Sequence, residues 1–347
     1  MLQCAYMSDK PYSSSSGIST VGQIARFLGK LWVIVTAVLG SLLIVSIIGI
    51  GVAIRHGVSP DMISPPPTQK VIKKAGAAKI AVVHLDGIIG EDDQHGIGAA
   101  GSSVSSTRVN HLLDQIADDV DVKAVVLRIN SPGGAVVASD EIYRRVEALQ
   151  KKKIVIANMG DVAASGGYYI AVGANKIVAN PATITGSIGV IAQFPKLSGL
   201  YTKLGVEMRT FKSGQFKDIG SESRDLTNEE KQILNGIITA SYDQFVTTVS
   251  KGRHMDEQKV RQLADGRIYV GTQAKELGLV DELGDIETAY AMAKDLAHLD
   301  NPSIVEYSDH SFFDSLLNSK AGSITLGASL DHLLPTRFGM YYLWSTE

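Results

Sequence analysis

The sequence predicts an α/β fold in which a mostly parallel sheet is covered by helices and preceded by one transmembrane helix. Three observations predict it. From Lys79 onward, short apolar runs rich in β-branched residues alternate with stretches of helical spacing. Glycine and proline mark a turn between such runs, as in "NSPGG". Ahead of this region, Leu31 to Ile54 contains no charged residue.

The first 77 residues divide into three segments. Residues 1–30 form a polar, serine-rich tail, 31–54 the transmembrane helix, and 55–77 a proline-rich linker. The apolar segment has twenty-four residues, which at ~1.5 Å rise per residue cover a bilayer core of about 30 Å. A buried soluble helix and a cleaved signal peptide are the alternatives, but the segment exceeds the usual ~7–15 residue signal core. Lysine and arginine lie on both sides, so charge leaves the orientation open.

Residues 78–300 are expected to form one domain, followed by a C-terminal tail at 301–347. Strands and helices alternate in its first half, which favours parallel strands with right-handed crossovers. The predicted strands are 79–89, 122–129, 152–159 and 175–181, and the predicted helices are 108–119, 138–149 and a stretch opening at Ser165. The second half is predicted to hold a strand at 206–211 and helices at 227–251, 256–263 and 285–297. Thr227 and Glu230 have the spacing of a capping box at the start of the longest helix.

The composition excludes several kinds of function. The net charge is −3 with acidic and basic residues interspersed, so the sequence carries no basic footprint for nucleic acid. Cys4 is the only cysteine, which excludes a disulfide or a cysteine-based metal site in the domain. The sequence has no HExxH or CxxC pattern and no phosphate-loop lysine pattern. We therefore expect no metal, no nucleotide and no other cofactor.

Two glycine-rich turns follow consecutive predicted strands. "NSPGG" contains Gly133 and Gly134, whose backbone N–H groups can face open space and receive a developing oxyanion. "AASGGYY" puts Ser165 at a helix start, among small neighbours that leave room for a peptide. Taken alone, the first motif is more often a plain turn and the second a helix N-cap. Because parallel strands end at one edge of a sheet, the two together favour a nucleophile beside an oxyanion hole, and hence acyl transfer.

A serine nucleophile needs a base, and the histidines do not offer one. None of the upstream histidines, His84, His95 and His111, has a glycine-rich or acid-flanked setting that suggests a triad, and His254 falls in a charged segment at a helix end. A lysine can take this role, and "FKSGQFKDIG", residues 211–220, offers Lys212 and Lys217. A free lysine has a pKa near ~10.4, so a lysine base must be buried without a paired carboxylate. We therefore expect the adjacent Asp218 to point away from Lys217.

Five stretches between residues 79 and 290 resemble a known family, in the family's own order. They are "RINSPGG", "AASGGYYIA", "ANPATITGSIGVI", "SGQFKDIGS" and "ADGRIYVGTQAKELGLVDELGD". The chain resembles bacterial signal peptide peptidase A in its short, single-repeat form, a serine peptidase of family S49 with a Ser–Lys dyad. The resemblance implies the repeated ββα fold shared by Clp proteases and crotonases, and makes 78–300 the peptidase domain.

The resemblance also assigns roles to individual residues. Ser165 would be the nucleophile, and Lys217, not Lys212, the general base. Ser187, in "TGSIG", would orient the lysine amine by a hydrogen bond. Gly133, Gly134 and Gly166 would supply the oxyanion hole.

A function follows from the resemblance as an expectation. The protein would be a serine endopeptidase anchored by Leu31–Ile54, degrading the signal peptides left after their release from preproteins. Its partners would be signal peptides, unfolded apolar peptides and further copies of the chain in a ring or dome with active sites near subunit interfaces. We expect a single-pass protein of the cell membrane with its peptidase domain outside the cytoplasm, and a substrate added as a strand beside "NSPGG".

Three other interpretations stay open. A crotonase-like acyl-CoA enzyme shares the fold, but it needs acidic catalytic residues and no serine nucleophile. A non-enzymatic membrane scaffold would have no use for the filled dyad positions. A protease of the same chemistry acting on other membrane-protein targets is compatible with every motif above.

Overall fold

The computed structural model describes residues 68–91, 103–308 and 341–343, together with Lys30, Trp32, Thr36, Val38, Gly40 and Ser41. Contacts divide the chain into two compact units, Met1–Pro66 and Pro67–Glu347. The six described residues of the first unit are helical. In the described part of the chain, no helix is both long enough and apolar enough to span a bilayer. The predicted transmembrane segment, 31–54, lies outside the described residues at all but five scattered positions.

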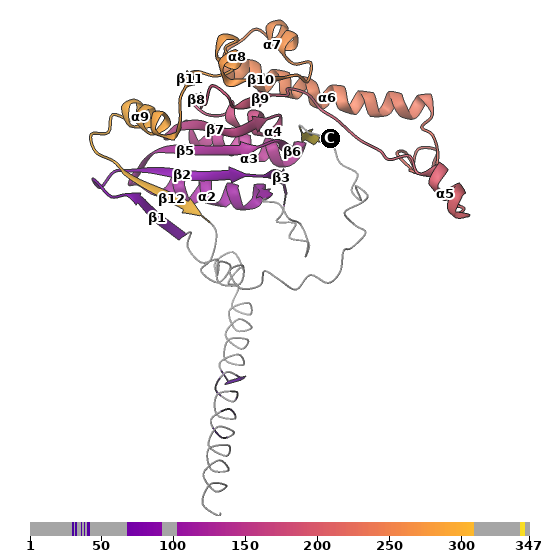
Figure 1. The fold of residues 1–347 in the computed structure, drawn as a ribbon, viewed down its shortest axis with the longest axis horizontal. Helices are drawn as coiled ribbons and strands as arrows, with labels where there is room; N and C mark the ends of the chain where they lie inside the picture. Colours follow the sequence, from indigo (N-terminus) through magenta and orange to yellow (C-terminus); the bar gives the residue numbers. More distant parts are fainter. Residues whose placement is uncertain are drawn as a thin grey trace, which may run out of the picture. The chain divides into compact units, whose positions relative to one another are not determined.

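The second unit is built on a mostly parallel sheet, as the alternating pattern predicted (Figure 1). Its main path runs in the order β1-β12-β2-β5-β7-β8-β11, with β9 paired to β7 and β10 paired to β9. All pairs are parallel except β1 with β12 and β10 with β9. In chain order the strands are β1 Thr68–Lys73, β2 Lys79–Asp86, β5 Val122–Ser131, β7 Ile154–Ala164, β8 Lys176–Ala179, β9 Ile184–Gly186, β10 Ile268–Val270, β11 Glu282–Leu283 and β12 Ser303–Ser308.

Helices cover both faces of this sheet, which is why its central strands are almost continuously apolar. On one face lie α2 (Ser106–Asp118), α3 (Val136–Leu149) and α4 (Gly166–Ala171), and on the other lies α9 (Ile286–Leu296). Strand β5 shows the division, since Val125, Leu127 and Ile129 face the first group. The alternate residues Ala124 and Val126 pack with α9.

A second, smaller sheet lies beside the carboxyl edge of the main one. Its order is β13-β6-β3-β4, formed by Tyr341–Leu343, Gly133–Ala135, Ile88–Gly90 and Ser103–Ser105. The central strand β6 is the "GGA" of the predicted oxyanion turn. It pairs with β3 on one side and antiparallel with β13, near the end of the chain, on the other.

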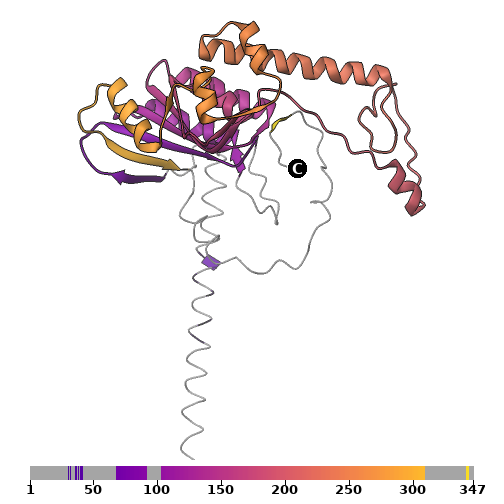
Figure 2. The same ribbon diagram turned by 45° about the horizontal axis from the view of Figure 1, so that its top comes forward.

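Residues 190–237 form an extension that we call the arm. It consists of the segment that connects the main sheet to α6 (Asn228–Arg253) and of the start of that helix. It contains α5 (Ser198–Leu204), and Figures 1 and 2 show α5 and the N-terminal half of α6 projecting beyond the sheets. The long helix begins with the predicted capping box, because Thr227 Oγ1 accepts from the Glu230 N–H and the Glu230 carboxylate accepts from the Thr227 N–H. After α6 come α7 (Glu257–Leu263) and α8 (Gly271–Glu276).

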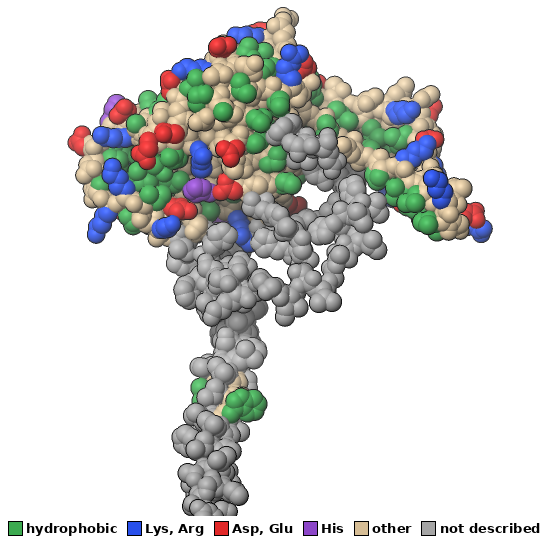
Figure 3. Space-filling view, viewed as in Figure 1, with side chains coloured by type: hydrophobic (Ala, Val, Ile, Leu, Met, Phe, Trp, Pro, Cys, Tyr) green, Lys and Arg blue, Asp and Glu red, His purple; other side chains and the backbone are tan. Residues whose placement is uncertain are grey.

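The strand predicted at 206–211 is wrong, because these residues form no strand. The segment runs along the arm, where no neighbouring strand among the described residues offers backbone partners, and β propensity alone does not make a sheet. Its apolar side chains are consequently exposed, Phe211 to 97%. Figure 3 shows apolar side chains, in green, among charged ones on the arm. The exposed large apolar residues of the arm are Ile191, Leu200, Leu204, Val206, Met208, Phe211, Phe216, Ile233 and Ile237.

Two strands of the main sheet lie outside the predicted peptidase domain, residues 78–300. Strand β1 lies within the segment 55–77 that was interpreted as a linker, and β12 lies within the tail, 301–347. Both belong to the main sheet, since β12 is parallel to β2 and carries β1 on its outer side. The predicted strand 152–159 is also longer than expected and continues to Ala164, directly before Ser165.

Candidate active site

Ser165 stands at a strained turn between a strand and a helix. Strand β7 ends at Ala164 and α4 begins at Gly166, while Ser165 itself has φ 51° and ψ −115°. This conformation costs a non-glycine residue on the order of 1–3 kcal/mol, and such a turn is how hydrolases present a nucleophilic serine. The Ser165 backbone N–H donates to the Gly186 carbonyl at 2.8 Å, and its carbonyl accepts from the Tyr169 N–H at 2.8 Å.

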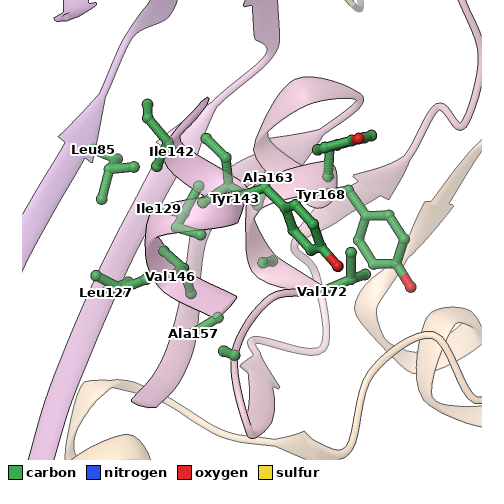
Figure 4. Packing of buried hydrophobic residues seen from close by; sticks show 14 of the residues in the cluster. Leu85, Leu127, Ile129, Ile142, Tyr143, Val146, Ala157, Ala163, Tyr168 and Val172 are labelled. Carbon is green, nitrogen blue, oxygen red and sulfur yellow. The ribbon is translucent and has the colours of Figure 1, made fainter. Parts of the chain in front are cut away.

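Ser165 is buried among packed residues. The residue is 1% exposed, and its hydroxyl makes no hydrogen bond with any described residue. Ala163, two residues before Ser165, belongs to a buried cluster that also contains Ile129 of β5, Ile142 of α3 and Tyr168 of α4 (Figure 4). The turn thus presents a buried hydroxyl that does not cap α4 and that no described residue engages.

The three predicted oxyanion glycines come together beside this serine. A Cβ added to Gly166 would lie 3.1 Å from the Gly134 nitrogen and 3.2 Å from the Gly133 Cα. A Cβ on Gly134 would lie 2.0 Å from the Ile89 carbonyl oxygen, so only glycine lets β6 approach β3 this closely. The Gly133 N–H donates to Ser131 Oγ at 3.1 Å. Gly166 opens α4, so its N–H has no partner within the helix and is a candidate donor to an oxyanion, and Gly134 lies beside it.

Ser187 lies at the same edge of the sheet as Ser165. Ala164 of β7 is paired with Gly186 of β9, so the two serines follow directly on paired residues. Like Ser165, Ser187 has a positive φ, 50°, and is buried at 7% exposure. Its backbone N–H is fixed by the Arg267 carbonyl at 2.8 Å. The register of β7 and β9 therefore brings together two of the three residues predicted for the catalytic chemistry.

Lys217 is not brought to Ser165 within the chain. It lies on the arm, which projects away from α4 in both ribbon views (Figures 1 and 2). The residue is exposed, and its side chain makes no hydrogen bond or ion pair with the described residues. One chain thus assembles the serine, the glycines and Ser187 but leaves the predicted base outside the site.

The loop that contains Lys217 has two lysines, and only one of them is free of hydrogen bonds to described residues. Lys212 is engaged, since its Nζ donates to the Asp218 carboxylate at 2.7 Å and to the Gln215 carbonyl at 3.0 Å. Arg224 binds the same carboxylate at 2.7 Å. The Arg224 guanidinium, with help from the Lys212 ammonium, holds the pKa of Asp218 well below its ordinary value. The Asp218 carboxylate is thus turned toward Arg224 and Lys212, as expected, and Lys217 is the amine of the pair that no described residue engages.

Arg224 and the second function of Glu230 were not predicted from the sequence. Glu230 is almost fully buried and binds Arg224 as well as capping α6. The signal was present in "SRDLTNEE", where an arginine precedes a capping box by three residues. Spacing alone does not say that this arginine turns back onto Asp218.

A cavity of about 550 Å³ lies near this site without including it. It is on the α9 side of β7, and its lining includes Arg128, Asp161, Val162, Ile184 and Tyr290. Ser165 is not part of that lining. Among the described residues, no cluster of three or more His, Cys, Asp or Glu side chains could hold a metal ion.

Two family profiles cover the residues of these motifs. The profile of Peptidase family S49 matches residues 147–300, and that of Clp protease matches residues 98–184. A solved structure, a point mutant of ClpP1 from Listeria monocytogenes, aligns with a TM-score of 0.39 at 18% identity, covering 59% of this chain and 91% of that one.

Three curated relatives are similar to this chain, and in two of them the similar region covers most of the relative's own length. A protease candidate of Methanocaldococcus jannaschii is 42% identical over 233 residues, which is 67% of this chain and 75% of the relative. A candidate signal peptide peptidase SppA of Enterococcus faecium is 39% identical over 254 residues, 71% of this chain and 72% of the relative. Protease 4 of Haemophilus influenzae is 39% identical over 223 residues, 63% of this chain and 35% of the relative. With the strained serine turn and its glycines inside the matched region, the chain belongs to peptidase family S49 and is a serine protease.

Proposed function

We propose that this serine protease is an endopeptidase with Ser165 as nucleophile and with Lys217 of a second copy of the chain as general base. One observation carries the proposal. The buried turn at Ser165 is complete except for a base, whereas Lys217 is exposed on a projecting arm. An amine that cannot act within its own chain is well placed to act in a neighbour.

The chemistry follows the usual course of acyl transfer. The neutral amine takes the proton of Ser165 Oγ, which attacks the peptide carbonyl, and the N–H groups of Gly134 and Gly166 receive the developing oxyanion. The ammonium then gives its proton to the leaving amine, and water completes hydrolysis with the same lysine as base. The Ser187 hydroxyl would hold the lysine amine by a hydrogen bond. Enclosure of an amine in a subunit interface without a paired carboxylate favours its neutral form.

The exposed apolar residues of the arm support a partner of this kind. Several large apolar side chains exposed on one projecting segment favour an interaction site. A copy whose arm docks on the next copy makes a head-to-tail contact, which repeats until a ring closes. We therefore propose a homo-oligomeric ring or dome in which each active site combines Ser165 of one copy with Lys217 of another.

The end of the chain supports the predicted mode of substrate binding. Strand β13 pairs antiparallel with β6, with Tyr342 opposite Gly134 and Leu343 opposite Gly133. The edge of the oxyanion strand therefore accepts an extended segment through backbone hydrogen bonds. We propose that an extended substrate takes the same place, with its scissile carbonyl beside Ser165.

The substrate class and location rest on the sequence. We propose that Leu31–Ile54 anchors the protein as a single-pass helix in the cell membrane, with the peptidase domain outside the cytoplasm. Confinement to the membrane surface raises the effective concentration of membrane-lodged peptides without new contacts. The substrates would be remnant signal peptides and other unfolded apolar peptides.

The full chain in lipid nanodiscs tests this function. A peptide with a charged start and an apolar centre should be cleaved, and a matched peptide with a serine-glycine centre should not. Equal cleavage of both would contradict the substrate class while leaving the protease activity intact. Cleavage only of a membrane protein lacking such a segment would favour the alternative of other membrane targets. Fluorophosphonate labelling at Ser165 separates the protease from an acyl-CoA enzyme of similar fold, which would not react.

Gly166→Ala is expected to lower kcat by about 10²- to 10³-fold, the usual loss when one oxyanion donor is displaced. The new Cβ would lie 2.5 Å from Ser139 Oγ and press toward Gly134. Adding Ser139→Ala removes the first of these clashes and should restore Tm but not kcat, because the approach to Gly134 remains. Peptide hydrolysis and thermal unfolding measure the two effects separately. Wild-type kcat in Gly166→Ala would exclude this glycine from the oxyanion hole.

A further inference from the structure

We propose that Arg224 is a positioning residue that keeps the Asp218 carboxylate away from the Lys217 amine, so that this amine can act as a base. The inference rests on the proposed function of Lys217. In this proposal Arg224 does not touch the substrate and acts on Lys217 only through Asp218. Its basis is the arrangement of four charged side chains on the arm.

Arg224 uses its guanidinium on two carboxylates at once. Toward Asp218, Nε donates to Oδ2 at 3.0 Å and Nη2 donates to Oδ1 at 2.7 Å. Toward Glu230, Nη1 donates to Oε2 at 2.9 Å and Nη2 donates to Oε1 at 2.5 Å. Such a two-pronged pairing fixes orientation as well as distance, which a lysine cannot do.

The second carboxylate ties this arrangement to a rigid element. Glu230 is 1% exposed and also accepts the Thr227 N–H at 2.8 Å, as part of the capping box of α6. The other end of α6 is held in the core through Phe245, Val246 and Val249. Arg224 therefore connects Asp218, and with it the backbone next to Lys217, to a helix whose other end is packed.

The chemical consequence concerns the charge next to the base. A free carboxylate within about 4–6 Å of an amine favours its ammonium form, commonly by 1–3 pH units. Asp218 adjoins Lys217 in sequence, but Arg224 and Lys212 engage its oxygens. Hydrogen bonds from Arg224 keep the pKa of Glu230 low, as they do for Asp218, so both carboxyls stay ionised at neutral and alkaline pH.

Two other acidic side chains of the arm have partners of their own. The Asp225 carboxylate pairs with Lys196 at 2.6 Å, and the Glu222 carboxylate accepts the Tyr201 hydroxyl at 3.2 Å. Glu229 lies in the first turn of α6, with Lys231 following on the same helix. Of these acids Asp218 is adjacent to Lys217 in sequence, and it is the one held from two sides.

The test is the pH dependence of kcat/KM for peptide hydrolysis by the full chain. Arg224→Gln leaves the Asp218 carboxylate held by Lys212 alone. The rising limb of the profile should therefore shift to higher pH by about 1–2 units, with about a 10- to 100-fold loss of kcat/KM on the acid side of the limb. Arg224→Lys keeps the charge but not the two-sided pairing and should fall between. The double variant Arg224→Gln with Asp218→Asn removes this carboxylate altogether and should return the limb to its wild-type position.

A matched control removes an arginine–aspartate pair elsewhere. Arg261 binds Asp243 at 2.8 Å, away from the arm, and Arg261→Gln should leave the limb in place. If Arg224→Gln lowers turnover equally at every pH, or the double variant does not return the limb, Arg224 has only a structural role and the inference fails. If Lys217→Ala itself retains turnover, the proposed function fails first, and the two failures are distinguishable.

Discussion

Replacing Ser165 with alanine is expected to lower kcat by about 10⁴-fold or more, the range seen when a serine nucleophile is removed. The reason is that Ser165 lies in the buried, strained turn and carries the hydroxyl that no described residue engages. Alanine keeps the Cβ, so the backbone strain and the packing of α4 should change little. Thermal unfolding should therefore stay close to the wild type while hydrolysis is lost.

Ser103→Ala is a matched control for this result. The Ser103 hydroxyl is buried in β4 and has no hydrogen-bond partner among the described residues. Its loss should leave kcat and fluorophosphonate labelling unchanged, whereas Ser165→Ala should abolish both. Labelling that persists in Ser165→Ala would assign the nucleophile to another serine.

Lys217→Ala is expected to have an effect of similar size, on the order of 10³-fold or more in kcat, because no other group takes the proton of Ser165. The side chain is exposed and unpaired in the described structure, so its removal from the arm should not lower stability. Lys203 is the matched control, since it is exposed on α5 of the same arm and has no ion-pair partner in the described residues. Lys203→Ala should hydrolyse peptides at the wild-type rate, and a loss equal to that of Lys217→Ala would indicate general damage to the arm.

Local patterns predicted the parts of the fold that local chemistry decides. The alternation of β-branched and helical segments predicted the parallel sheet, and Thr227 with Glu230 predicted the start of α6. The convergence of Ser165 and the glycines also followed, because consecutive parallel strands end at one edge. These predictions needed only periodicity, capping rules and sheet topology.

The remaining features depend on partners distant in sequence. Residues 206–211 look like a strand by composition, but a strand exists only where another strand pairs with it, and the described part of the arm offers none. Strand β1 is the opposite case. Its sequence is polar and was not predicted to be a strand, but it forms one by pairing with β12, more than 200 residues later in the chain. The exposure of Lys217 has the same origin, because the position of the arm depends on how α6 packs.

Mixing two inactive variants tests the central claim most directly. Ser165→Ala and Lys217→Ala are each purified, dissociated, combined in equal amounts and reassembled, and peptide hydrolysis is measured against each variant alone. If each site takes its serine from one copy and its lysine from the next, random mixing restores about a quarter of the wild-type turnover. Activity that stays at the level of the separate variants, in oligomers shown to contain both chains, would contradict a site shared between copies.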